Sequence, residues 1–79
     1  MQITKGQLIN AIDVLIEDLE INNPIYKSVI DVAQNPVIRA ISAALGRTPT
    51  YFAKPIEEYV QFDLRKIKEA KEELQFKLN

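Results

Sequence analysis

The sequence predicts an all-α fold, a small bundle of four main helices in a single domain of 79 residues. Three observations predict it. Apolar residues recur at helical spacing along several stretches, and no stretch shows the alternation or the turn dipeptides of a β-hairpin. In addition, Asn-Pro occurs at positions 23–24 and 35–36, and this pair favours the start of a helix.

The first helix is expected over residues 4–21. Thr4 is a good N-cap, and Gln7 can complete a capping box with it. One side of the helix is apolar, and it comprises Leu8, Ile12, Leu15, Ile16 and Leu19. The opposite side carries Asp13, Glu17 and Glu20. Three carboxylates on one face can in principle hold a hard cation, but an acidic face opposite an apolar one is typical of the side of a helix that lies in water, so we expect no metal there.

The repeated Asn-Pro predicts two further helices, over residues 24–34 and 36–45. Asn is a preferred N-cap, and proline fits the first helical position, where no N–H is needed. A residue before proline is also pushed out of the α conformation, so each pair ends the element before it. Gly46 suits the position after a helix, where φ is often positive. A single helix kinked at Pro36 is the alternative.

A short helical turn is expected at residues 49–53, and a long helix over residues 55–78. Thr48-Pro49 repeats the cap-and-proline signal, and Pro55 marks the next start. Lys71 occupies the one position of a seven-residue apolar repeat that is not apolar. The repeat runs through Val60, Leu64, Ile67, Leu74 and Leu78. At 1.5 Å per residue this helix is roughly 36 Å long, longer than so small a domain is wide, so it must protrude or meet a partner.

The composition is that of a folded globular domain, with 47% hydrophobic and 27% charged residues and a net charge of −1. A core of this size is marginal, and the chain has no cysteine and no histidine for disulfides or for the usual zinc sites. Dimerisation is the remaining route to extra stability, and we expect a homodimer. The same inventory excludes nucleophilic triads, and the two glycines form no phosphate-binding loop. We therefore expect no enzyme, no cofactor and no small-molecule substrate.

The chain is expected in the cytoplasm. The absence of cysteine is compatible with a reducing compartment. Residues 1–4 do not begin a signal peptide, because no basic region precedes a long apolar one. No apolar run approaches the ~20 residues needed to cross a bilayer, so no membrane partner is expected.

Residues 37–54 carry three bases and no acid, whereas residues 1–36 are acidic. Residues 38–54, IRAISAALGRTPTYFAK, resemble the helix-turn-helix segments of AraC-type activators and IS30-type transposases, in which an Ala- and Leu-rich helix ends in Leu-Gly and a capped helix follows. The resemblance implies a recognition helix in the major groove of DNA, with Phe52 in the core. It implies DNA contacts from Arg39, Arg47, Thr48, Thr50, Tyr51 and Lys54. The chain departs from this family at Ser42, where alanine is favoured, and at Pro55, which interrupts the recognition helix.

The last predicted helix favours a different function. Tyr59, Phe62 and Phe76 flank its apolar seam and widen it, and wide apolar helix faces mark sites of partner binding or self-association. The predicted partner or dimer face comprises Tyr59, Phe62, Leu64, Ile67, Leu74 and Phe76. The alternative is that the other helices cover this face. The leading hypothesis is a non-catalytic binding or regulatory protein of the inhibitor, immunity, adaptor or phage- and plasmid-modulator type; the second is a small DNA-binding regulator that uses residues 36–54.

Overall fold

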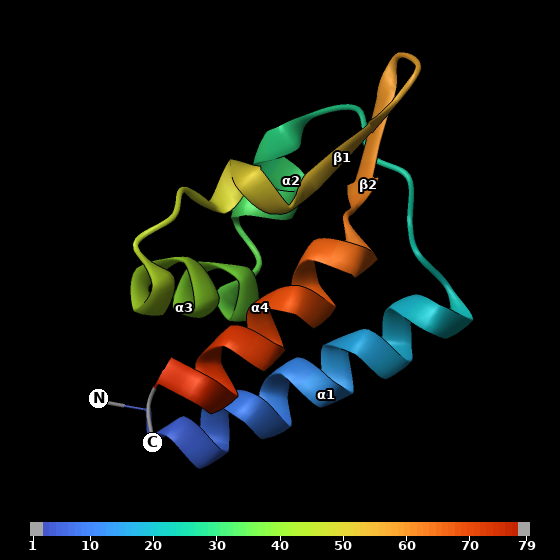
Figure 1. Cartoon of the computed structure of the whole chain (residues 1–79). Coiled ribbons are helices and arrows are strands. Elements are labelled where there is room, and N and C mark those ends of the chain that lie inside the picture. The colour runs from blue at the N-terminus through green and yellow to red at the C-terminus, as the bar shows by residue number, and fades with distance from the viewer. Residues whose placement is uncertain (1–2, 78–79) are drawn as a thin grey trace.

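A computed structural model of the chain describes residues 3–77 and shows a small, mostly helical domain (Figure 1). The elements in chain order are α1 (Lys5–Ile21), α2 (Val29–Ala33), α3 (Pro36–Leu45), the 3-10 turn η1 (Pro49–Phe52), β1 (Ala53–Ile56), β2 (Tyr59–Phe62) and α4 (Leu64–Lys77). The predicted helical fold is therefore confirmed within the described residues, with a two-stranded hairpin added to it. Leu78, the last member of the predicted repeat, lies outside the described residues.

The helices α1 and α4 lie side by side and antiparallel, and α3 packs near the C-terminal half of α4 (Figure 1). Ion pairs join α1 to α4: Lys71 binds Asp13, and Lys68 Nζ lies 3.0 Å from a carboxylate oxygen of Glu20. Lys71, the polar member of the predicted apolar seam, therefore lies at the edge of the α1–α4 contact. Part of the acidic face of α1 faces the bases of α4.

The start of α1 follows the predicted capping box. Thr4 Oγ1 accepts a hydrogen bond from the backbone N–H of Gln7, and the side chain of Gln7 accepts one from the backbone N–H of Thr4. Four members of the predicted apolar side are buried, namely Leu8, Ile12, Ile16 and Leu19. Leu15 is partly buried and packs against the same core. The signal that starts this helix is complete within its first turn.

The predicted helix over residues 24–34 is wrong in its first half. The helix α2 covers only Val29–Ala33, and Ser28 caps it by accepting a hydrogen bond from Ile30 N. Asn23 caps no helix, because its side chain binds the backbone of Phe62. Residues 23–26 instead run beside β2, which explains why Pro24 does not begin a helix.

The helix α3 has the predicted bounds. Asn35 Oδ1 accepts hydrogen bonds from Val37 N and Ile38 N at 2.8 and 3.2 Å, and Pro36 is the first helical residue. Gly46 follows the helix with φ of 68°. Because α2 ends at Ala33, the chain has two helices here and not a single helix kinked at Pro36.

The hairpin replaces the start of the predicted helix over residues 55–78. Pro55 pairs with Val60 in the antiparallel register. The backbone N–H and C=O of Val60 both form hydrogen bonds with Tyr26, at 2.9 and 2.8 Å. Val60 therefore requires no hydrogen bond from Pro55, the residue opposite it in β1. Proline, which has no N–H, fits that position on an edge strand. In the tight turn between the strands, Glu57 adopts a positive φ of 54°.

The helix α4 is shorter than predicted. Asp63 precedes it and caps it, accepting a hydrogen bond from Lys66 N at 3.1 Å. Its 14 residues correspond to roughly 21 Å at 1.5 Å per residue, well short of the roughly 36 Å expected. The predicted start of this helix at residue 55 is therefore wrong, and the argument that its length requires it to protrude or to meet a partner no longer applies.

The core lies between the α1–α4 pair, α3 and the inner face of the hairpin. Phe52, which the helix-turn-helix resemblance places in the core, is fully buried in it. The other members without exposure are Ile12, Val32, Ile38, Ile41 and Ile67. Ser42 is also buried, and its Oγ donates a hydrogen bond to Ile38 O at 2.7 Å, so the hydroxyl donor is satisfied.

Candidate functional site

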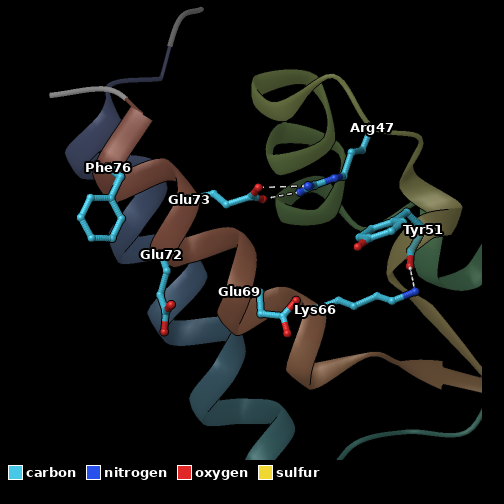
Figure 2. A pocket seen from close by; sticks show the side chains of 7 residues that line it. All are labelled: Arg47, Tyr51, Lys66, Glu69, Glu72, Glu73 and Phe76. Atoms are coloured by element: carbon cyan, nitrogen blue, oxygen red, sulfur yellow. Dashed lines mark hydrogen bonds and ion pairs between the residues drawn. The ribbon is translucent and has the colours of Figure 1, made fainter.

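A groove of about 530 Å³ runs between α4 and the α3–η1 corner, which we define as residues 46–52. Figure 2 shows its lining: the corner contributes Arg47 and Tyr51, and α4 contributes the other five residues. These are Lys66, Glu69, Glu72, Glu73 and Phe76. The groove combines both signs of charge with two aromatic side chains.

The local sequence places the corner against α4. Gly46 takes a left-handed conformation that ends α3, and the N–H of Arg47 donates to the carbonyl of Ser42 at 2.9 Å. Thr48-Pro49 then begins the 3-10 turn. This turn buries Phe52 and leaves Tyr51 39% exposed at the mouth of the groove.

Basic and aromatic groups hold the ring of Tyr51 in place. Lys66 Nζ lies 4.2 Å from the ring centroid and Arg47 Cζ lies 5.0 Å from it. Lys66 Nζ also donates to the backbone carbonyl of Tyr51 at 3.4 Å. The ring of Phe52 meets that of Tyr51 edge to face, with centroids 5.1 Å apart. These contacts position the ring in advance of any binding.

An ion pair joins the corner to α4 across the groove. Both terminal nitrogens of Arg47 donate to the carboxylate of Glu73, one of them at 3.0 Å (Figure 2). Hydrogen bonding to this carboxylate raises the pKa of Arg47 above its ordinary value. The pair fixes the guanidinium in a fork-to-carboxylate geometry. Arg47 is therefore neutralised within the molecule.

The other α4 carboxylates of the groove are less engaged. Glu72 makes no hydrogen bond or ion pair within residues 3–77. Glu69 lies 3.9 Å from Arg65 Nε, in a pair whose two side chains are more than half exposed. Phe76, one turn beyond Glu72, is 82% exposed. This side of α4 presents negative charge and an aromatic ring to solvent.

The residues predicted to contact DNA do not lie on one recognition helix. After four residues of η1 the chain enters β1, so the segment that would continue the helix is extended. Arg47 is bound by Glu73. The exposed members of the set are Arg39, Thr48, Thr50, Tyr51 and Lys54. They are distributed over α3, the corner and β1.

The residues of the predicted partner face are divided between core and surface. Phe62, Ile67 and Leu74 are buried, and Leu64 is partly buried. The alternative, that other elements cover the seam, is correct for these side chains. Tyr59 and Phe76 are exposed, but they lie at opposite ends of the molecule, one in the hairpin and one near the end of α4 (Figure 1). The six residues do not form one surface.

Four groove residues were not among the sequence candidates, namely Lys66, Glu69, Glu72 and Glu73. Their spacing from Lys66 to Phe76 places them along one side of a helix, and this signal is present in the sequence. Interleaved charges at that spacing are also typical of any helix in water. Only the fold shows that this side of α4 faces an aromatic corner.

Within residues 3–77, no group of His, Cys, Asp or Glu side chains is placed to hold a metal ion. None of the helices in this range is both long and apolar enough to span a membrane. Comparisons with protein-family models, curated proteins and solved structures gave no match for this chain.

Proposed function

We propose that this chain is a non-catalytic binding protein that acts through another protein, in the manner of an inhibitor, immunity protein, adaptor or phage- and plasmid-borne modulator. The observation that supports the proposal is the groove between α4 and the α3–η1 corner. It exposes two aromatic side chains, Tyr51 and Phe76, on elements that pack directly on the core. Exposed Tyr and Phe side chains are enriched at protein interfaces. The lack of cysteine fits a reducing cytoplasm as the place of action.

Site-specific photo-crosslinking in the cells that express the chain tests this proposal. A benzoylphenylalanine in place of Phe76 should form a discrete crosslink to a protein. The same group in place of Val14, which is 59% exposed on α1 and outside the groove, is the matched control. Tyr51→Ala should weaken the Phe76 crosslink. Equal, diffuse crosslinking from both positions would contradict the proposal.

Self-association is a second form of the same proposal, because a homodimer can use the exposed Phe76. Sedimentation velocity at rising protein concentration measures it. A dimer that Phe76→Ala converts to a monomer would identify a second copy as the partner. If the chain is a monomer at all concentrations, the partner must be a different protein.

DNA binding is the second candidate function. It is favoured by the exposed bases Arg39 and Lys54 in a segment that has no acid. Fluorescence anisotropy of a labelled mixed-sequence duplex tests it at low and moderate salt. Each phosphate contact should make log Kd rise by about 0.9 per log unit of salt. Binding that Lys54→Glu weakens would place DNA first, and the absence of binding at low salt would remove this candidate.

A further inference from the structure

The α4 side of the groove has a charge pattern that indicates what it binds. Lys66, Glu69, Glu73 and Phe76 follow one another at intervals of three or four residues, so their side chains lie along one side of the helix. Glu72 lies beside this stripe and lines the same groove. From Lys66 to Phe76 the stripe is about 15 Å long at 1.5 Å per residue. A base is at one end, acids are in the middle, and an aromatic ring is at the other end.

The middle of the groove has negative charge that the chain neutralises only in part. Glu73 is bound by Arg47, and Glu69 forms an exposed ion pair with Arg65 and also interacts electrostatically with Arg47. Glu72 has no partner within the described residues. Lys66 does not compensate them, because its ammonium is directed to the carbonyl and the ring of Tyr51 (Figure 2). A ligand with positive charge at this point can form ion pairs with the carboxylates of Glu69 and Glu72.

The two aromatic rings define the rest of the ligand. Tyr51 borders the groove on the corner side and Phe76 borders it at the end of α4 (Figure 2). Both rings offer apolar contact, and Phe76 has most of its surface free for it. The complementary ligand therefore carries apolar side chains on either side of its positive charge.

Building on the proposed function, we infer that the groove binds a basic amphipathic segment of a partner protein. Its Lys or Arg side chains face Glu69 and Glu72, and its apolar side chains pack on Tyr51 and Phe76. A helix of about ten residues matches the 15 Å length of the stripe, as in helix-in-groove recognition.

Selection from random peptides displayed on phage tests the inference, with the full chain as the target. Peptides of about twelve residues are long enough to span the groove as a helix. Those recovered should be rich in Lys or Arg with apolar neighbours. The double variant Glu69→Gln/Glu72→Gln should bind them about five- to tenfold more weakly, through the loss of two partly exposed ion pairs. Added salt should weaken binding to the native chain, because it screens exposed charges.

The matched control is Glu17→Gln/Glu58→Gln, which removes the same charge at two exposed positions outside the groove. It should bind the selected peptides as the native chain does. Circular dichroism of each variant verifies that the fold is intact.

The alternative outcomes separate this inference from the proposed function. Peptides whose binding depends on Tyr51 and Phe76 but not on Glu69 and Glu72 would overturn the inference that the segment is basic. They would support the proposal that the groove binds a protein. If no recovered peptide responds to Tyr51→Ala or Phe76→Ala, or if none is recovered, both proposals are overturned. A dimer dissociated by the same two substitutions would identify a second copy as the occupant and would overturn a different partner.

Discussion

The two Asn-Pro pairs have the same residues and different structures. At the second pair, the side chain of Asn35 binds N–H groups in the first turn of α3, and the helix begins at Pro36. At the first pair, the side chain of Asn23 binds the backbone of Phe62 in β2, and no helix begins at Pro24. In both places the amide satisfies backbone groups at the end of an element. The first element is a strand and the second is a helix.

The difference comes from what lies beside each pair. Residues 23–26 run along β2, where Tyr26 exchanges two backbone hydrogen bonds with Val60 and its ring meets that of Phe62. An N-cap contributes about 1 kcal/mol. Strand pairing together with a partly buried aromatic contact outweighs that amount. A cap signal is therefore decisive only where no strand competes for the same side chain.

The largest effect is expected at Phe62, which holds β2 and residues 23–26 together. Its side chain is 4% exposed and its ring lies 6.0 Å from that of Tyr26. Phe62→Ala should lower the free energy of unfolding by about 3–5 kcal/mol, measured by urea denaturation with circular dichroism. In a chain this small, the loss can remove the cooperative transition altogether.

The control for this prediction is Tyr59→Ala, in the same strand with 43% of its surface exposed. It should change the free energy of unfolding by less than about 1 kcal/mol, because no buried contact is lost. If both substitutions cost the same, β2 does not belong to the core.

Aspartate at each Asn-Pro pair compares the two directly. Asn35 acts only as an acceptor, which a carboxylate replaces at a helix N-terminus, so Asn35→Asp should stay within about 0.5 kcal/mol of the native chain. Asn23 Nδ2 donates to Phe62 O at 3.0 Å, and a carboxylate cannot donate this bond. Asn23→Asp should therefore destabilise by about 1–3 kcal/mol.

Urea denaturation of the two aspartate variants at neutral pH gives the comparison. Equal tolerance of Asp at both positions would mean that Asn23 acts as an acceptor only, which is the behaviour of an N-cap. The contrast between the two pairs would then be lost.

The helices that could be predicted from the sequence are those whose signals are local. In α1 the cap and its partner are three residues apart, and in α3 the cap, the proline and Gly46 lie within or beside the helix. The hairpin could not be predicted because Glu57 and Glu58 are not the usual residues of a two-residue turn. The apolar spacing after Val60 also matched a helix. The alternation of buried and exposed residues in Tyr59–Phe62 is four residues long, too short to decide between the two.

Only part of the candidate site could be predicted, because its residues come together only through the fold. Arg47 and Tyr51 were predicted as DNA contacts, and both line the groove, but the fold directs Arg47 to Glu73. The acidic stripe of α4 has the pattern of any exposed helix side. Its relevance depends on α4 beginning after the hairpin, and that depends on the pairing of Tyr26 with Val60.

A smaller effect is expected at Gly46 and Glu57, which have positive φ at the end of α3 and in the turn of the hairpin. Gly46→Ala should destabilise by about 1 kcal/mol, through conformation alone, because a Cβ would meet no atom within 4 Å. Glu57→Gly should have the opposite sign and gain about 0.5 kcal/mol, since glycine adopts φ of 54° without strain. Thermal unfolding of both variants measures the signs. A loss of stability in Glu57→Gly would indicate that the glutamate side chain stabilises the turn by more than its backbone strain costs.

The smallest effect is expected at Ser28, which supplies the cap that the first Asn-Pro pair does not. Ser28 Oγ accepts a hydrogen bond from Ile30 N at 3.2 Å at the start of the five-residue α2. Ser28→Ala should cost about 0.5 kcal/mol in urea denaturation, near the lower end for a cap, because so short a helix is held chiefly by the burial of Val32. Ser28→Asp retains an acceptor and is the control that should lose little. Two results together would contradict this: Ser28→Ala and Ser28→Asp both leave stability unchanged, and Asn23→Ala reduces the helical signal in the far-UV spectrum. The first Asn-Pro pair would then also support a helix, α2, and the two pairs would differ in their distance from the helix and not in their role.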